Sequence, residues 1–174
     1  MFVSVNRDRT NIQPLQLYRA QLAAKDTGAL RIEAVCKEAG VTFAFHIPGS
    51  TRSLPPGQPQ AVSTIHELLV RHGDGPVTMA LKTLVAAYPD TPGQLRGQVI
   101  ETVATMLAKY GERIDAEHLK EVLAERDCEE PVDAARRYKK LMGGSTIAGM
   151  MAALVKNYNR GRTGHRRLPA AEKR

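Results

Sequence analysis

The 174-residue chain has no tryptophan and only 5% aromatic residues, although 43% of its residues are hydrophobic. A core built with so few large rings must be mostly aliphatic. That composition favours helices packed on helices over a sandwich of sheets. The length allows one domain with a sizeable core.

Cysteine is also scarce, because Cys36 and Cys128 are the only two. They give no framework of disulfides and no zinc-binding pattern, which fits a reducing cytoplasm. No apolar run reaches the roughly 18 residues that cross a bilayer, and we expect no signal peptide. The sequence therefore predicts a cytoplasmic protein with no membrane partner.

Residues at catalytic or metal-binding spacing are missing as well. His66 and His72 are six residues apart rather than four, and no other histidines approach ligand spacing. Ser50, Ser53 and Ser145 lie outside any nucleophile-elbow motif. We therefore predict no catalytic residue, no cofactor and no metal, and a protein that is not an enzyme.

Apolar residues recur at helical spacing along most of the chain. In the first forty residues, two such patterns meet at a turn, with Thr27 as the predicted cap of the second and Gly40 at its end. The chain is predicted to be all-α, multi-helical and helix-turn-helix-containing, with seven or eight helices. The predicted helices lie near residues 15–22, 27–40, 62–72, 76–88, 99–110, 115–123, 132–142 and 147–158.

Residues 43–59 are rich in Pro, Gly and Ser and predict a loop. Apolar residues alternate from Val41 to Ile47, which allows at most a small β-hairpin near residues 41–54. A wing-like hairpin beside the helices and a plain insertion both fit this pattern.

Positive charge concentrates at the C-terminal end. Residues 156–174 hold seven Lys or Arg and one Glu, a net of +6 in a chain whose formal net charge is +7. Such an excess points to a polyanion partner. Gly161, Gly164 and Pro169 interrupt any helix there. We therefore predict a helical domain at residues 1–155 and a flexible basic arm at 156–174. A solvated tail that only aids solubility is the alternative.

A resemblance to a known family lies in residues 2–41. In order, Asn6-Arg7-Asp8-Arg9, the linker at 11–14 and the helical segment at 18–22 resemble elements of the ParB family of partition proteins. These elements are an Asn-x-x-Arg sequence, a polar linker with a Pro, and a helix with Ala and Leu that precedes a helix-turn-helix. The resemblance covers about forty of 174 residues and is greater to the ParB-like proteins of phages and plasmids.

The resemblance implies a nucleic-acid context without a nuclease or nucleotide site. The family's N-terminal ParB or sulfiredoxin-type domain, with its Gly- and Arg-rich nucleotide-contacting box, has no counterpart here. Residues 41–49, where a recognition helix should follow, look extended instead. We therefore expect a DNA-binding protein of ParB-like descent, in phage, plasmid or mobile-element maintenance or in transcription regulation, with double-stranded DNA as partner.

The alternative is a non-catalytic helical interaction or scaffold module, or a fragment of a larger ParB-like nuclease-type protein. If the chain binds DNA as expected, basic side chains of the first helical pair and the tail should converge on one surface. Otherwise they should scatter and leave an apolar patch exposed. The sequence leaves open a homodimer and which helical pair contacts DNA. The predicted DNA-contacting residues are Arg7, Arg9, Arg19, Arg31, Lys82, Arg136, Arg137, Lys156, Arg160, Arg162, Arg166 and Arg167.

Overall fold

The computed structural model describes residues 13–44, 54–125 and 145–170. These residues form seven α-helices and no strand, and 68% of them are helical. The predicted all-α fold is confirmed. The predicted helix at 132–142 lies outside the described residues, as do four of the predicted DNA-contacting residues: Arg7, Arg9, Arg136 and Arg137.

In chain order the helices are α1 (Pro14–Ala23), α2 (Thr27–Glu38), α3 (Val62–His72), α4 (Asp74–Ala87), α5 (Gly97–Tyr110), α6 (Ala116–Ala124) and α8 (Thr146–Tyr158). Two short 3-10 helices, η2 (Gly111–Arg113) and η3 (Gly164–Arg166), follow α5 and α8. Each of these α-helices coincides with one of the apolar patterns in the sequence.

Short polar residues cap three of the helices. The Asp26 carboxylate accepts a hydrogen bond from the Ala29 N–H at 2.9 Å, so α2 is capped one residue before the predicted Thr27. Asp115 caps α6 and Ser145 caps α8 in the same way. These caps satisfy backbone N–H groups that have no partner within the helix.

Glycines in the left-handed region separate consecutive helices. Gly40 (φ +70°) ends α2, and the Val41 N–H then donates to the Cys36 carbonyl at 2.8 Å. Gly73 (φ +78°) alone joins α3 to α4. The α4 helix therefore begins at Asp74, two residues before the predicted start at Pro76. Pro76 is tolerated there because N–H groups in a first turn make no intrahelical bond.

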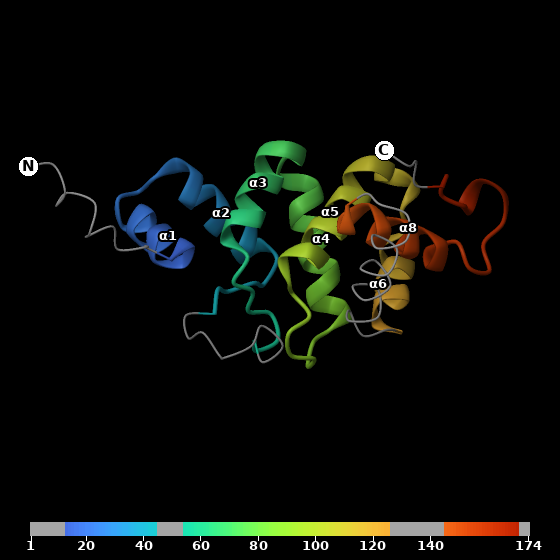
Figure 1. Ribbon diagram of the computed structural model, residues 1–174, viewed down its shortest axis with the longest axis horizontal. Helices are drawn as coiled ribbons and strands as arrows, with labels where there is room; N and C mark the ends of the chain where they lie inside the picture. Colours follow the sequence, from blue (N-terminus) through green and yellow to red (C-terminus); the bar gives the residue numbers. More distant parts are fainter. Residues whose placement is uncertain (1–12, 45–53, 126–144, 171–174) are drawn as a thin grey trace, which may run out of the picture.

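The helices form two rows that run along the molecule (Figure 1). One row contains α1, α3, α5 and α8, each in contact with the next, and the other contains α2, α4 and α6. The most extensive contacts join α4 and α5. The α1–α2 pair lies at one end of the elongated molecule, and α8 with the C-terminal segment lies at the other.

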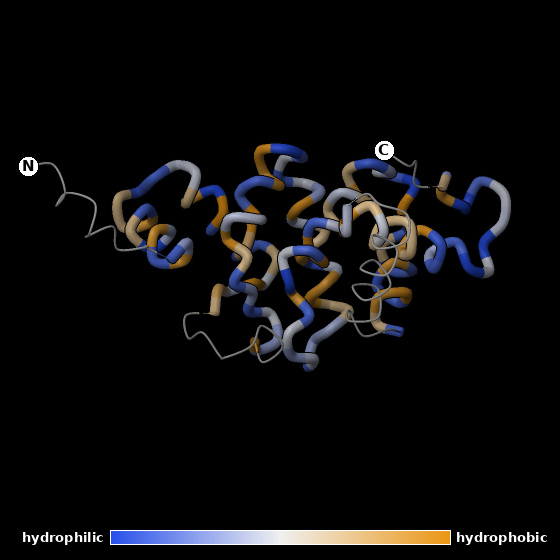
Figure 2. Tube along the Cα trace, in the orientation of Figure 1, coloured by the Kyte–Doolittle hydropathy of each residue, from blue (hydrophilic) through white to orange (hydrophobic). Residues whose placement is uncertain are grey.

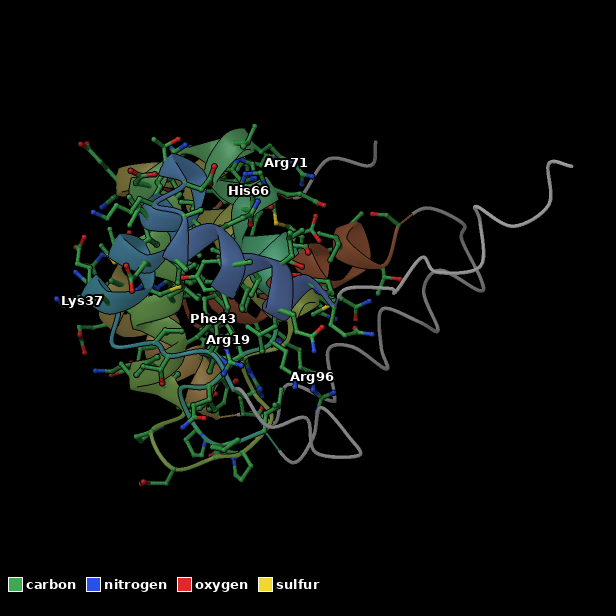
Figure 3. All side chains as sticks on the ribbon, turned by 90° about the vertical axis from the view of Figure 1, so that its left-hand side faces the viewer. Arg19, Lys37, Phe43, His66, Arg71 and Arg96 are labelled. Carbon is green, nitrogen blue, oxygen red and sulfur yellow. The ribbon has the colours of Figure 1, made fainter. Side chains whose placement is uncertain are left out.

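Hydrophobic residues line the inside of both rows. The hydropathy of the chain alternates along the helices, with hydrophilic residues frequent on the outer turns (Figure 2). Viewed from the α1–α2 end, the labelled cations point in different directions: Lys37 lies at one edge, and Arg71 and Arg96 lie on the other side (Figure 3).

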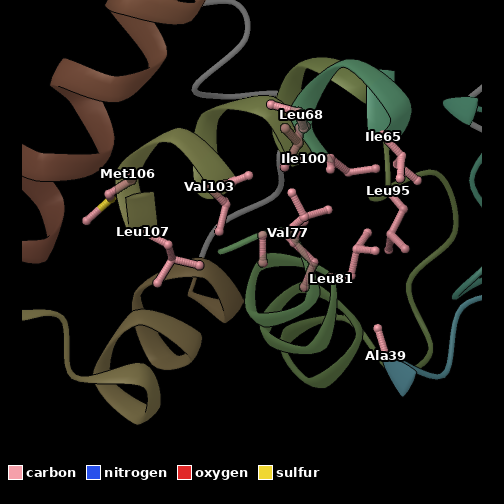
Figure 4. Close-up of a cluster of buried hydrophobic side chains, with 14 of the residues drawn as sticks. Ala39, Ile65, Leu68, Val77, Leu81, Leu95, Ile100, Val103, Met106 and Leu107 are labelled. Carbon is pink, nitrogen blue, oxygen red and sulfur yellow. The ribbon is translucent and has the colours of Figure 1, made fainter. Parts of the chain in front are cut away.

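The centre of the core is aliphatic, as the composition predicts. Ile65 and Leu68 from α3 meet Val77 and Leu81 from α4 and Ile100 from α5 (Figure 4). All five side chains are fully or almost fully buried. Burying a residue of this size stabilises the fold by about 1.5–3 kcal/mol, so α3, α4 and α5 hold the array together.

The described part of the segment between α2 and α3 contains no strand, in agreement with the prediction of at most a small β-hairpin near residues 41–54. The Thr42 N–H donates to the Gly57 carbonyl, and the Ala44 N–H donates to the Pro59 carbonyl. Residues 42–44 and 57–59 therefore run in the same direction, whereas a hairpin needs opposite directions. Pro59 has no N–H to return a bond. Residues 45–53, which would include the rest of a hairpin, lie outside the described part of the chain.

Candidate nucleic-acid interface

The chain turns back on itself after α8 and closes a short loop. The side-chain amide of Asn159 makes both closing bonds: its Oδ1 accepts from the Leu168 N–H at 2.7 Å, and its Nδ2 donates to the Leu168 carbonyl at 2.8 Å. Residues 160–167 lie between these two anchor points, and we call them the basic loop. Compact loops of this length with adjacent ends are frequently functional.

The basic loop has the sequence Arg-Gly-Arg-Thr-Gly-His-Arg-Arg and contains no acidic residue. Gly161 (φ +75°) and Gly164 (φ +58°) provide the two left-handed turns that reverse the chain. Half of the loop residues are therefore arginines, concentrated in a closed turn at one end of the molecule (Figure 1).

Arg162 points inward and fixes the side of the loop. Its guanidinium lies 4.6 Å from the centroid of the Tyr158 ring and donates to the Tyr158 hydroxyl at 3.1 Å. It also donates to the Asp115 carboxylate at 3.0 Å, and its side chain is only 16% exposed. Arg162 was predicted to contact DNA, but these bonds place it as an internal anchor instead.

Asp115 joins the loop to the start of α6. The backbone N–H of His118 and the guanidinium of Arg162 lower the pKa of the Asp115 carboxyl, so the group is ionised at neutral pH. The Asp115 N–H donates to the Tyr158 hydroxyl at 2.8 Å. The ring of Tyr158 is fully buried and stands edge-on to the His118 ring. The loop is thus attached to α6 as well as to α8.

Residues 156–170 of the expected basic arm are packed on the folded body. Residues 156–158 complete α8, Leu168 is only 4% exposed, and the Tyr110 hydroxyl donates to the Pro169 carbonyl at 3.0 Å. Two interactions explain this packing: the burial of the Leu168 side chain and the hydrogen bonds of the Asn159 amide. Both compensate for the conformational entropy that the segment loses when it becomes ordered. Residues 171–174 lie outside the described part of the chain.

Four predicted DNA-contacting residues remain exposed around the loop: Lys156, Arg160, Arg166 and Arg167. No carboxylate of the described residues lies within ion-pair distance of these four side chains. Their cationic groups are available to an external anion. Residues 156–170 contain no acidic residue that would offset their charge. This is the feature of the described surface that most resembles a phosphate-binding site.

Two of the predicted contacts in the helical pairs, Arg31 and Lys82, are ion-paired within the fold. Arg31 Nε lies 2.7 Å from Asp74 Oδ1, and its Nη2 donates to the Leu69 carbonyl. Lys82 Nζ lies 2.8 Å from Glu38 Oε1. Both ion pairs join α2 to α4, about two turns apart. The structure therefore uses Arg31 and Lys82 to align two helices.

The predicted basic residues that the structure describes do not converge on one surface. Arg19 and Arg31 belong to α1 and α2, whereas the basic loop lies at the opposite end of the molecule (Figure 1). The second helix of the first pair, α2, carries Glu33 and Glu38 against Arg31 and Lys37, so it has no net charge. By the criterion stated from the sequence, duplex contact by the first helical pair together with the tail is not favoured.

In the described part of the chain, exposed large apolar side chains are few and come from four different helices: Leu17, Leu30, Val70 and Met79. A hollow of about 400 Å³ lies between α1, α2 and residues 41–43. Its floor includes Tyr18 and Cys36, and burial raises the pKa of each to about 12. A thiol with that pKa stays protonated near pH 7, so Cys36 lacks the properties of a nucleophile.

In comparisons with family models, curated proteins and solved structures, the chain matches none. Within the described ranges, no three His, Cys, Asp or Glu side chains are grouped to hold a metal ion. None of the described helices combines the length and the apolar character needed to cross a membrane.

The sequence contained one signal for the packed loop that charge counting missed. Leu168 is the single large apolar residue after Tyr158, and Asn159 directly follows the last helix. A lone apolar residue beyond a Gly-interrupted segment, together with an Asn at a helix end, is compatible with a closed turn.

Proposed function

We propose that the protein binds double-stranded DNA without catalysis, through phosphate contacts made by the basic loop and by Lys156. One observation carries this proposal: the loop is closed on a folded surface and exposes Arg160, Arg166 and Arg167, which have no ion-pair partner among the described residues. Arginine suits such a site because its planar guanidinium can donate two parallel hydrogen bonds to a phosphate. The ParB-like resemblance supplies the context, which is phage, plasmid or mobile-element maintenance or regulation in the cytoplasm.

Contacts of this kind recognise the backbone and carry no base sequence. The proposal therefore differs from the sequence-based expectation in one respect. The helical pairs serve as scaffold, and the DNA contact lies at the α8 end. Sequence preference, if there is any, has to come from groups other than Arg31 and Lys82, which hold α2 and α4 together.

The salt dependence of binding tests this proposal. Each neutralised phosphate adds roughly −0.9 to the slope of log K against log salt concentration. Four exposed cations predict a slope of about −3.6 for a monomer on a mixed-sequence duplex. A homodimer would present two loops and about double the slope, so molar mass should be measured by light scattering on the same sample. No binding at low salt would reject the proposal.

The alternative function is a helical interaction module, and the separation of the basic residues favours it. Two rows of packed helices offer long lateral faces on which a partner protein can lie. In that case the binding site would lie on the helical rows and would not include the loop arginines. Competition separates the two: duplex DNA should not displace a protein partner from a site on the helical rows.

A further inference from the structure

We infer that the closed basic loop makes the protein selective for double-stranded over single-stranded nucleic acid, with Asn159 as the residue that positions the arginines. This inference rests on the proposed function and concerns how the same site chooses its ligand. The fixed positions of the loop arginines, and not their charge alone, would then determine the preference for duplex over single-stranded nucleic acid.

Two sets of contacts restrict the loop before any ligand arrives. The Asn159 amide joins its two ends, with bonds of 2.7 and 2.8 Å to the Leu168 backbone. Arg162 ties its middle to Asp115 and Tyr158. The outward side chains of Arg160, Arg166 and Arg167 therefore start from backbone positions that are fixed relative to one another.

A fixed set of cations and a flexible one differ in what they recognise. Phosphates on a duplex have a regular spacing on a stiff helix, whereas those on a single strand change position continually. A preorganised loop avoids the ordering cost when it meets a preorganised ligand. Single-stranded DNA must still become ordered on the loop, so its binding benefits less from the preorganised arginines than duplex binding does. A flexible arm would adapt to either ligand and discriminate mainly by charge density.

Asn159 is suited to test this idea because its side chain carries no charge and its amide closes the loop. Both ends of the amide bond the Leu168 backbone. Asn159→Ala removes the closure and leaves every cation of the protein in place. Asn157→Ala is the matched control, since Asn157 lies two residues earlier in the last turn of α8 and its side chain makes no hydrogen bond within the described residues.

The experiment measures fluorescence anisotropy of a labelled 20-base-pair duplex of mixed sequence and of one of its strands, with the full-length chain. For the wild type we expect tighter duplex binding. For Asn159→Ala, duplex affinity should fall about five-fold and single-strand affinity by less than about two-fold, because only the preorganised match is lost. The salt slope should stay the same, since the cations remain. Asn157→Ala should behave as the wild type.

Each other outcome has a definite meaning. In Asn159→Ala, faster amide exchange at Leu168 would prove that the loop is open. If the ratio of duplex affinity to single-strand affinity is then unchanged, the inference is overturned, whereas the proposed DNA binding stands. Equal wild-type affinity for both ligands does the same. Failure of the wild type to bind either ligand rejects the proposed function itself. If Asn159→Ala loses its helical circular dichroism signal, two glycines inserted after Thr163 lengthen the loop instead, and the same ratio decides.

Discussion

The hydroxyl of Tyr158 lies between the Asp115 N–H, 2.8 Å away, and the Arg162 guanidinium, 3.1 Å away, and accepts a hydrogen bond from each. One buried side chain on α8 thus connects the first residue before α6 with the middle of the basic loop. The loop is held by this contact and by Asn159, so the segment with the highest positive charge is also part of the folded body.

Tyr158→Phe tests the importance of this hydroxyl. The substitution leaves the Asp115 N–H and one guanidinium N–H without their partner, so we expect the free energy of unfolding to fall by about 1–3 kcal/mol. Urea denaturation measures it. Tyr18→Phe is the matched control, because the Tyr18 hydroxyl has no hydrogen-bond partner among the described residues. An equal loss in both variants would contradict the assigned role of Tyr158.

Lys25 is a second point at which stability can be tested. It has φ +56° in the turn between α1 and α2, where the Asp26 N–H donates to the Gln21 carbonyl. This conformation costs a non-glycine residue roughly 1–2 kcal/mol, whereas glycine costs about 0.5–1 kcal/mol in chain entropy. Lys25→Gly should therefore stabilise the protein by about 0.5–1 kcal/mol. Ala24→Gly, at φ −79°, should destabilise it instead. A lower thermal midpoint for Lys25→Gly would contradict the turn geometry.

The ion pair between Glu38 and Lys82 allows a test that keeps net charge constant. Glu38→Lys or Lys82→Glu alone places like charges together, so each should lower stability by up to about 1 kcal/mol. The double exchange restores the pair and should recover most of the loss. It also moves the cation from α4 to α2. Because we assign Lys82 to helix alignment, DNA affinity of the double variant should equal that of the wild type. A loss of DNA affinity in the double variant without a loss of stability would indicate that Lys82 contacts DNA.

Stability should decrease in alkali because two buried groups resist ionisation. Burial raises the pKa of Cys36 from 9.0 to about 12, and burial, with Cys36 and Glu33 nearby, raises that of Tyr18 from 10.0 to about 12. The unfolded chain releases these protons first. The stabilising contribution is therefore complete below about pH 9 and is lost as the pH rises towards 12. The urea midpoint of the wild type should fall between pH 8 and pH 11, and the midpoint of Cys36→Ala should fall less steeply over the same range. Identical slopes would contradict the burial of this thiol.

Local signals in the sequence predict the helices well, and contacts between distant residues account for what was missed. The stripes of Ile65 and Leu69 in α3 and of Met150 and Leu154 in α8 identify their helices because spacing along one helix is a local property. The pairing of Arg31 with Asp74 depends on how α2 and α4 are placed in space. Nothing in the sequence near Arg31 indicates that its charge is already satisfied.

The same limit explains the basic loop. Charge and glycine content correctly indicate an exposed cationic segment, but the closure by Asn159 and the burial of Leu168 need the surface formed by α5, α6 and α8. A segment with one apolar residue has little reason to fold in isolation. It becomes ordered only where a prepared surface exists.

The location of the DNA contact can be tested by comparing two triple variants of equal charge. One replaces Arg160, Arg166 and Arg167 with Gln in the basic loop. The other replaces Arg19, Lys25 and Lys37 with Gln in the α1–α2 pair, where the ion-paired Arg31 is left intact. Each variant loses three positive charges, so any effect of net charge alone is the same in both.

The decisive measurement is the affinity of these two variants for a mixed-sequence duplex over a range of salt concentrations. We predict that the loop variant loses most of its binding and that its slope falls by about 2.7 in magnitude, as three lost phosphate contacts require. The α1–α2 variant should keep a slope close to that of the wild type. A larger loss of affinity and slope in the α1–α2 variant would contradict the account and place the DNA at the opposite end of the molecule.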